Sequence, residues 1–153
     1  MNDSKKVLLS GASGLIGRAL ASSLRQAGHE VSTLSRTRGD FIWDLRSRRL
    51  DAAALDGVDC VVHLAGETIA QRWTQSSRAC ILSSRVASTR LLADAILETG
   101  RPIDFICASG VNYYGHRCGN GQTEESPAGE GFLASVCQDW EAAHRLLSDA
   151  GQR

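Results

Sequence analysis

The feature that most constrains this chain is a short apolar run that ends in three glycines spaced three residues apart. Residues 6–10 read Lys-Val-Leu-Leu-Ser, and Gly11, Gly14 and Gly17 follow. In a strand–turn–helix unit, the first glycine allows a tight exit from the strand, the second lets a pyrophosphate approach the backbone, and the third lets the helix lie close to the sheet. The unpaired N–H groups at the helix start then offer a site for an anion. The stretch predicts a dinucleotide-binding turn, and a glycine-rich turn in an ordinary α/β domain is the alternative.

A nucleoside-triphosphate loop is excluded by the residues that follow the last glycine. That motif requires lysine and then serine or threonine after the glycine, because these side chains reach the phosphates and the magnesium ion. Here Arg18 and Ala19 follow Gly17.

Length and composition indicate a single domain over residues 1–153 with no strong charge. The chain carries 17 basic and 17 acidic side chains, so its formal net charge at pH 7 is zero. A balanced chain gives no indication of a nucleic-acid or membrane partner. No apolar run is long enough to span a membrane or to serve as a signal sequence. The five cysteines are odd in number and form no close pairs, which favours reduced thiols in a cytoplasmic protein, and we assign no metal site.

The spacing of apolar residues predicts alternating strands and helices. Ile16, Leu20, Leu24 and Ala27 recur at helical spacing after the first strand, and Gly28 is placed to end that helix. Further strands are expected over 29–36, 41–44, 60–64 and 105–109, a helical turn over 51–55, helices over 75–98 and from 132 to 151, and a polar loop over 115–131. Strands that alternate with helices predict an α/β protein with an open parallel sheet.

The end of the second strand carries the residues that should select the cofactor. The ribose of a bound dinucleotide is recognised about twenty residues past the glycine turn, where NAD-binding sites usually place Asp or Glu. Here the residues are Ser35 and Arg36. Arginine suits a ribose 2′-phosphate through charge-assisted hydrogen bonds. We therefore predict NADP(H) in preference to NAD(H), with Arg38 as a second candidate for the same phosphate; an exposed arginine that touches nothing is the alternative.

The third strand leads to the ligand side of the sheet. Residues 60–64 are apolar enough to be buried on both faces, and Ala65, Gly66 and Glu67 follow. The carboxyl ends of parallel strands face the ligand crevice. His63 is expected to be a hydrogen-bonded strand histidine rather than a catalyst, because one histidine without a partner supports no mechanism.

Several motifs, taken in order, resemble one family. They are Gly11 to Gly17, Leu64 to Glu67, Arg72-Trp73, Ser84-Arg85 with Thr89, Tyr113 to Gly115, and Phe132 to Glu141. Together they cover essentially the whole chain and are similar to the epimerase-family group of atypical, extended-type short-chain dehydrogenase/reductases, often labelled nucleoside-diphosphate-sugar epimerases. The resemblance implies a Rossmann-type, doubly wound parallel sheet in three α/β/α layers and an NADP cofactor. Asp44 stands where the family places a Trp-Asp pair near the adenine. The glycine motif and the resemblance together assign the cofactor contacts Gly11, Ser13, Gly14, Leu15, Ile16, Gly17, Ser35, Arg36, Asp44, Leu64, Ala65, Gly66 and Glu67.

The chain departs from this family at the usual catalytic residues. Classical relatives use Ser, Tyr and Lys, and the lysine lowers the pKa of the tyrosine so that it can exchange a proton with the substrate. The only lysines here are Lys5 and Lys6. The family pattern puts Gly110, Leu133 and Cys137 at the serine, tyrosine and lysine positions.

The remaining catalytic candidates at the crevice are Ser109, Tyr113 and Tyr114. Tyr113 and Arg117 have the usual tyrosine–lysine spacing, but in a predicted loop. Packing of the two tyrosines against the nicotinamide or neighbouring strands is the alternative.

Two functional hypotheses result. The first is an NADP-dependent oxidoreductase or epimerase acting on a carbonyl or nucleotide-sugar substrate; the second is a non-catalytic or truncated dinucleotide-binding module that acts as a sensor. Similar proteins continue into further strands and a substrate-binding portion, so the sheet here is expected to stop before its last strands. The substrate site would then be missing or built between subunits. The strand over 105–109 would have an unpaired edge, which favours a homo-oligomer.

Overall fold

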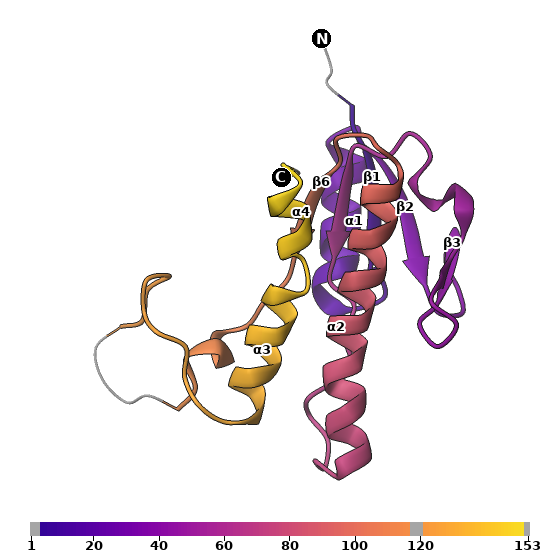
Figure 1. The fold of residues 1–153 in the computed structure, drawn as a ribbon. Helices are drawn as coiled ribbons and strands as arrows, with labels where there is room; N and C mark the ends of the chain where they lie inside the picture. Colours follow the sequence, from indigo (N-terminus) through magenta and orange to yellow (C-terminus); the bar gives the residue numbers. More distant parts are fainter. Residues whose placement is uncertain (1–3, 117–120, 152–153) are drawn as a thin grey trace.

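The computed structural model describes residues 4–116 and 121–151, which form a twisted sheet between helices (Figure 1). The elements are β1 (Lys6–Ser10), α1 (Leu15–Gln26), β2 (Glu30–Ser35), β3 (Phe41–Asp44), β4 (Arg49–Leu50), the 3₁₀ turn η1 (Ala52–Leu55), β5 (Cys60–His63), α2 (Gln75–Glu98), β6 (Asp104–Cys107), the 3₁₀ turn η2 (Val111–Tyr114), α3 (Phe132–Ala142) and α4 (Arg145–Asp149). The sheet order is β4-β3-β2-β1-β5-β6, and every neighbouring pair is parallel except β3–β4. The Rossmann-type doubly wound sheet is therefore confirmed.

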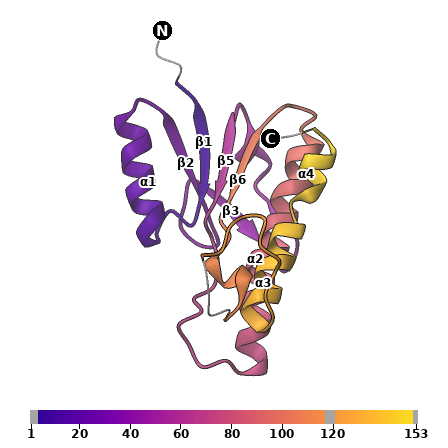
Figure 2. The same cartoon turned by 90° about the vertical axis from the view of Figure 1, so that its left-hand side faces the viewer.

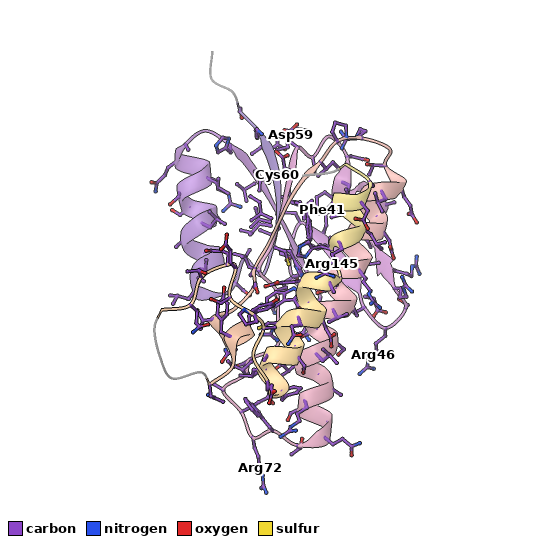
Figure 3. All side chains as sticks on the ribbon, turned by 60° about the vertical axis from the view of Figure 1, so that its left-hand side comes forward. Phe41, Arg46, Asp59, Cys60, Arg72 and Arg145 are labelled. Carbon is purple, nitrogen blue, oxygen red and sulfur yellow. The ribbon has the colours of Figure 1, made fainter. Side chains whose placement is uncertain are left out.

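The sheet separates two apolar clusters. Successive side chains of a strand point to opposite faces, so Val7 and Leu9 of β1 pack toward α1, whereas Leu8 packs with Leu92 and Ile96 of α2. Figure 2 shows α1 on one face of the sheet and α2, α3 and α4 on the other. The three expected layers are present, and the loop residues Arg46 and Arg72 project outward (Figure 3).

The chain direction reverses at the centre of the sheet. From β1 the chain moves to β2 and β3 on one side, and it then crosses to β5 and β6 on the other. At such a reversal the loops leaving the carboxyl ends of the two central strands diverge, which opens a crevice for a ligand. The fold thus brings the glycine turn after β1 next to the segment that follows β5.

Helix α2 occupies the predicted residues, and the predicted buried face of α1 is confirmed in part. Leu20 and Leu24 pack against the sheet as expected. Ile16 and Ala27 are exposed instead, while Gly17 and Ala21 are buried. The backbone of α1 lies directly against the carbonyl of Gly11, and this contact turns its small residues toward β1.

The last predicted helix is divided in two. His144, between α3 and α4, has φ −102° and ψ 0°, which interrupts the helical backbone. The N–H of Leu147 then donates to the His144 carbonyl, a tighter bond than the α-helical one. Trp140, Ala143 and Leu147 are nevertheless all buried, so the apolar stripe continues across the break and does not reveal it.

The short strand β4 was not predicted, because two residues are too few to show a periodic pattern.

Among the described residues, no helix has both the length and the apolar composition needed to cross a lipid bilayer. The thiols of Cys60, Cys80, Cys107 and Cys137 are free, and Cys118 lies outside the described residues.

Candidate functional site

The turn after β1 is built around glycines that a side chain would disrupt. Gly11 has φ +76°, and a Cβ there would lie 2.7 Å from the carbonyl carbon of Leu64. A Cβ on Gly17 would collide with the Gly11 carbonyl and with Ala12. These two glycines let α1 start directly over the carboxyl ends of β1 and β5.

Gly14 is less confined than Gly11 and Gly17. It is exposed, precedes α1, and provides no side-chain cap for the first N–H groups of that helix. A Cβ on Gly14 would approach only the Gly11 carbonyl oxygen, at 3.3 Å. The unpaired N–H groups at the start of α1 are therefore open to an anionic ligand.

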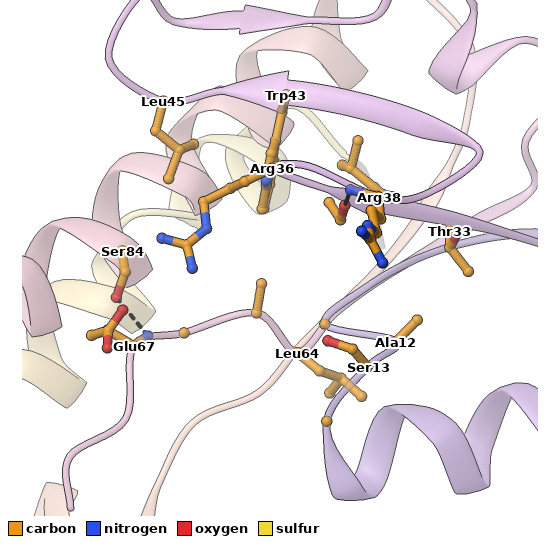
Figure 4. Close-up of a pocket in the computed structure, with 16 residues that line it drawn as sticks. Ala12, Ser13, Thr33, Arg36, Arg38, Trp43, Leu45, Leu64, Glu67 and Ser84 are labelled. Carbon is orange, nitrogen blue, oxygen red and sulfur yellow. Dashed lines mark hydrogen bonds between the residues drawn. The ribbon is translucent and has the colours of Figure 1, made fainter.

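A cavity of about 390 Å³ opens over this turn (Figure 4). Its lining comprises Gly11 to Gly14 from the turn, Leu64 to Glu67 with Ser84 on one wall, and Thr33 to Arg36, Arg38, Trp43 and Leu45 on the other. Residues from five separate elements thus converge at the switch point of the sheet.

Most of the predicted cofactor contacts lie on this cavity. They are Gly11, Ser13, Gly14, Ser35, Arg36, Leu64, Ala65, Gly66 and Glu67. Gly17 lies buried beneath the turn, and Leu15 and Ile16, 82% and 68% exposed, project from the first turn of α1 outside the lining. A direct contact of these three with a cofactor stays a prediction.

Asp44 also lies outside the lining. Its carboxylate accepts hydrogen bonds from the Ser47 hydroxyl at 2.8 Å and the Arg46 N–H at 2.9 Å, which lower its pKa. The carboxylate therefore shapes the turn between β3 and β4, and its neighbours Trp43 and Leu45 reach the cavity instead. A contact between Asp44 and the adenine stays a prediction.

Two arginines stand at the mouth of the cavity without protein partners. The guanidinium groups of Arg36 and Arg38 have neither a hydrogen bond nor an ion pair with any described residue, and Figure 4 shows Arg36 reaching across the cavity. The Ser35 hydroxyl oxygen accepts from the N–H groups of Arg38 at 2.8 Å and Thr37 at 3.2 Å. Ser35 thereby fixes the turn that carries both positive charges.

His63 lies beneath the cavity in a closed hydrogen-bond network. The Ser88 hydroxyl donates to the Ser84 carbonyl at 2.6 Å, so its oxygen accepts from His63 Nε2 at 2.9 Å. His63 Nδ1 then accepts from the Ser10 hydroxyl at 2.6 Å. Burial, with a smaller contribution from the Arg85 charge, lowers the pKa of His63 to about 4. The neutral ring joins β1, β5 and α2, which agrees with the structural role expected from the sequence.

The catalytic candidates lie after β6 and do not line this cavity. The Ser109 hydroxyl donates to the Glu141 carboxylate at 2.5 Å, and the Tyr113 and Tyr114 rings meet edge to face with centroids 5.3 Å apart. Arg117, the proposed substitute for the lysine, lies outside the described residues.

Gly110 and Cys137, which the resemblance places at the serine and lysine positions, lie close together. A Cβ on Gly110 would lie 3.5 Å from the Cys137 sulfur. Burial raises the pKa of the Cys137 thiol, which keeps it protonated at neutral pH.

The strand order, the glycine turn and the crevice define a Rossmann-type protein of the dinucleotide-binding class. The family model described as NAD dependent epimerase/dehydratase family matches residues 7–135. The chain belongs to this family.

Individual relatives agree with this assignment. The chain is 39% identical over 152 residues to the epimerase family protein Mb2239 of Mycobacterium bovis, covering 96% of this chain and 50% of that protein. A crystal structure of a nucleoside-diphosphate sugar epimerase from Corynebacterium glutamicum is similar with a TM-score of 0.86 and 41% identity, covering 99% of this chain and 33% of that one. The structure of the human epimerase family protein SDR39U1 (isoform 2) with NADPH has a TM-score of 0.79 and 36% identity, covering 92% and 48%. The chain spans about half the length of the curated relatives it matches.

Proposed function

We propose that this chain binds NADP(H) in the crevice at the switch point between β1 and β5. The observation that carries the proposal is the pair of unpartnered arginines, Arg36 and Arg38, beside an open glycine turn. A ribose 2′-phosphate would be the negatively charged partner that both guanidinium groups lack among the described residues. The pyrophosphate would lie over Gly14 and the start of α1. The NADPH in the human relative's structure supports this choice, while the family description alone names NAD.

The activity is a further proposal, drawn from the family to which the chain belongs. When bound, NADPH supplies a hydride, and we propose oxidation–reduction or epimerisation of a carbonyl or nucleotide-sugar substrate. Ser109, Tyr113 and Tyr114 remain the candidates for holding the substrate proton. We also propose a cytoplasmic location, in keeping with the free thiols.

Cofactor choice is tested by titrating the chain with NADPH and NADH in a calorimeter. We expect NADPH to bind more tightly and Arg36→Asp to reverse the order, because aspartate repels a 2′-phosphate and accepts from ribose hydroxyls. Loss of the phosphate contact should cost about 1–3 kcal/mol. Arg72→Asp, a matched charge change on an exposed arginine outside the cavity, should leave both affinities unchanged (Figure 3). Equal affinities of the unaltered chain for NADPH and NADH would contradict the assignment.

Catalysis is tested separately with NADPH and a panel of carbonyl compounds and nucleotide sugars. We expect no robust turnover of the usual Tyr-Lys type, because Leu133 and Cys137 stand at those two positions. Turnover that is lost in Tyr113→Phe would contradict this expectation and would exclude a non-catalytic binding module.

A further inference from the structure

Two consecutive side chains of α2 hold one residue of the cavity wall. The Glu67 N–H donates to the Ser84 hydroxyl oxygen at 2.9 Å, drawn as a dashed line in Figure 4. Arg85 Nη1 donates to the Glu67 carbonyl at 3.0 Å. Both side chains are fixed in turn, because the Ser84 hydroxyl and Arg85 Nη1 each donate to the Ile81 carbonyl at 3.1 Å. We call this arrangement the Ser84–Arg85 clamp.

The Arg85 side chain is itself enclosed between the wall and α3. Its guanidinium carbon lies 5.2 Å from the centre of the Trp140 ring, and a Cβ on Gly66 would lie 3.1 Å from the same carbon. A side chain on Gly66 would therefore push the guanidinium group out of its present position by a small amount.

This half-buried charge forms no ion pair with a described residue, although the Glu67 carboxylate acts on it at longer range. The ion pairs of the described chain involve other groups, and burial lowers the pKa of Arg85 without removing its charge. Enclosing a cation costs free energy unless its hydrogen bonds repay that cost. Arg85 Nη1 donates to two backbone carbonyls, and one of them belongs to the cavity wall.

We propose that Ser84 and Arg85 are positioning residues that hold Gly66 and Glu67 in a preformed wall for the cofactor. The inference rests on the proposed NADP(H) site. A wall held before binding does not have to be ordered at the moment of binding, which raises affinity without a direct contact. Trp140 of α3 packs against the Arg85 guanidinium group and helps to hold it in place. In this way α3 would contribute to cofactor affinity without lining the cavity.

The binding experiment compares Ser84→Ala, Arg85→Met and Arg85→Lys by NADPH fluorescence titration. Each variant removes one bond to Glu67. Loss of the neutral bond from the Glu67 N–H predicts about fivefold weaker binding for Ser84→Ala, and loss of the charge-assisted bond to the Glu67 carbonyl predicts about tenfold weaker binding for Arg85→Met. Arg85→Lys, which keeps the charge but not the planar donor group, should fall between Arg85→Met and the unaltered chain. Arg78→Met is the matched control, because Arg78 also lies on α2 over aromatic rings, those of Trp73 and Phe132, and outside the cavity lining.

Hydrogen exchange of the Glu67 amide supplies a readout that needs no cofactor. Without ligand, this amide should exchange at least about tenfold faster in Ser84→Ala than in the unaltered chain, while the amides of β1 and β5 keep their protection. Unchanged exchange, unchanged NADPH affinity in folded Ser84→Ala and Arg85→Lys, or an equal loss in Arg78→Met would overturn the clamp. If the unaltered chain bound no NADPH while the exchange result held, the proposed function would fail and the clamp would be confined to holding the turn.

Discussion

At Gly14 and Gly17 the same substitution should have opposite consequences. Gly14 has a φ of −73°, and a Cβ there would meet one atom, the Gly11 carbonyl oxygen, at 3.3 Å. Gly14→Val should therefore give a folded chain whose new side chain fills the place of the pyrophosphate. Gly17→Val should instead destabilise the protein, because its Cβ meets the Gly11 carbonyl. Circular dichroism and NADPH titration separate the two outcomes. Unchanged cofactor affinity in folded Gly14→Val would show that the turn is structural only.

His63 predicts how stability changes with pH. Its pKa is about 4 in the folded protein against an ordinary value of 6.5, so between these values the unfolded chain binds a proton that the folded chain does not. Stability should therefore fall as the pH drops from 6.5 to about 4, by up to about 3 kcal/mol from this group, with no further loss from it below that range. Urea unfolding at several pH values measures the slope, and His63→Gln should make it shallower. Parallel curves for the two proteins would contradict a buried neutral His63.

At the scale of elements, the ends of a helix were predicted correctly where particular residues mark them. The Thr74 hydroxyl accepts from the Ser77 N–H at 3.2 Å to start α2, and Gly100, with φ +62°, follows its end. The break between α3 and α4 carries no such mark, because His144 changes the backbone while the buried stripe continues. Periodicity reports which face is apolar, not whether the backbone is continuous.

In the candidate site, too, residues at a fixed spacing along the chain were predicted, whereas contacts between distant segments were not. The glycine turn and Arg36 were found because their spacing along the chain is fixed by local geometry. Ser84 was missed as a lining residue, since its place on the wall depends on how α2 packs beside the segment after β5. Contacts between residues seventeen positions apart leave no periodic signal in one sequence.

At the scale of the whole molecule, we predict self-association through the open edge of β6. Within the described residues it pairs only with β5, and Ile106 is 56% exposed beside an apolar groove of about 560 Å³ that includes Leu20, Val62 and Phe105. An open strand edge next to apolar surface favours pairing with a second copy. Sedimentation velocity over a range of concentrations should detect a dimer, and Ile106→Lys should abolish it. A strict monomer at high concentration would exclude this prediction.

The central claim, that NADP(H) occupies the crevice between the glycine turn and the two arginines, has one direct measurement. It is the change in backbone amide NMR shifts of the ¹⁵N-labelled chain as NADP⁺ is added. We predict that the largest changes lie at Gly11 to Gly14, Ser35 to Arg38 and Leu64 to Glu67, with little change in β4 and α4. Saturating shifts confined to other segments, or no shifts at millimolar NADP⁺, would contradict the claim.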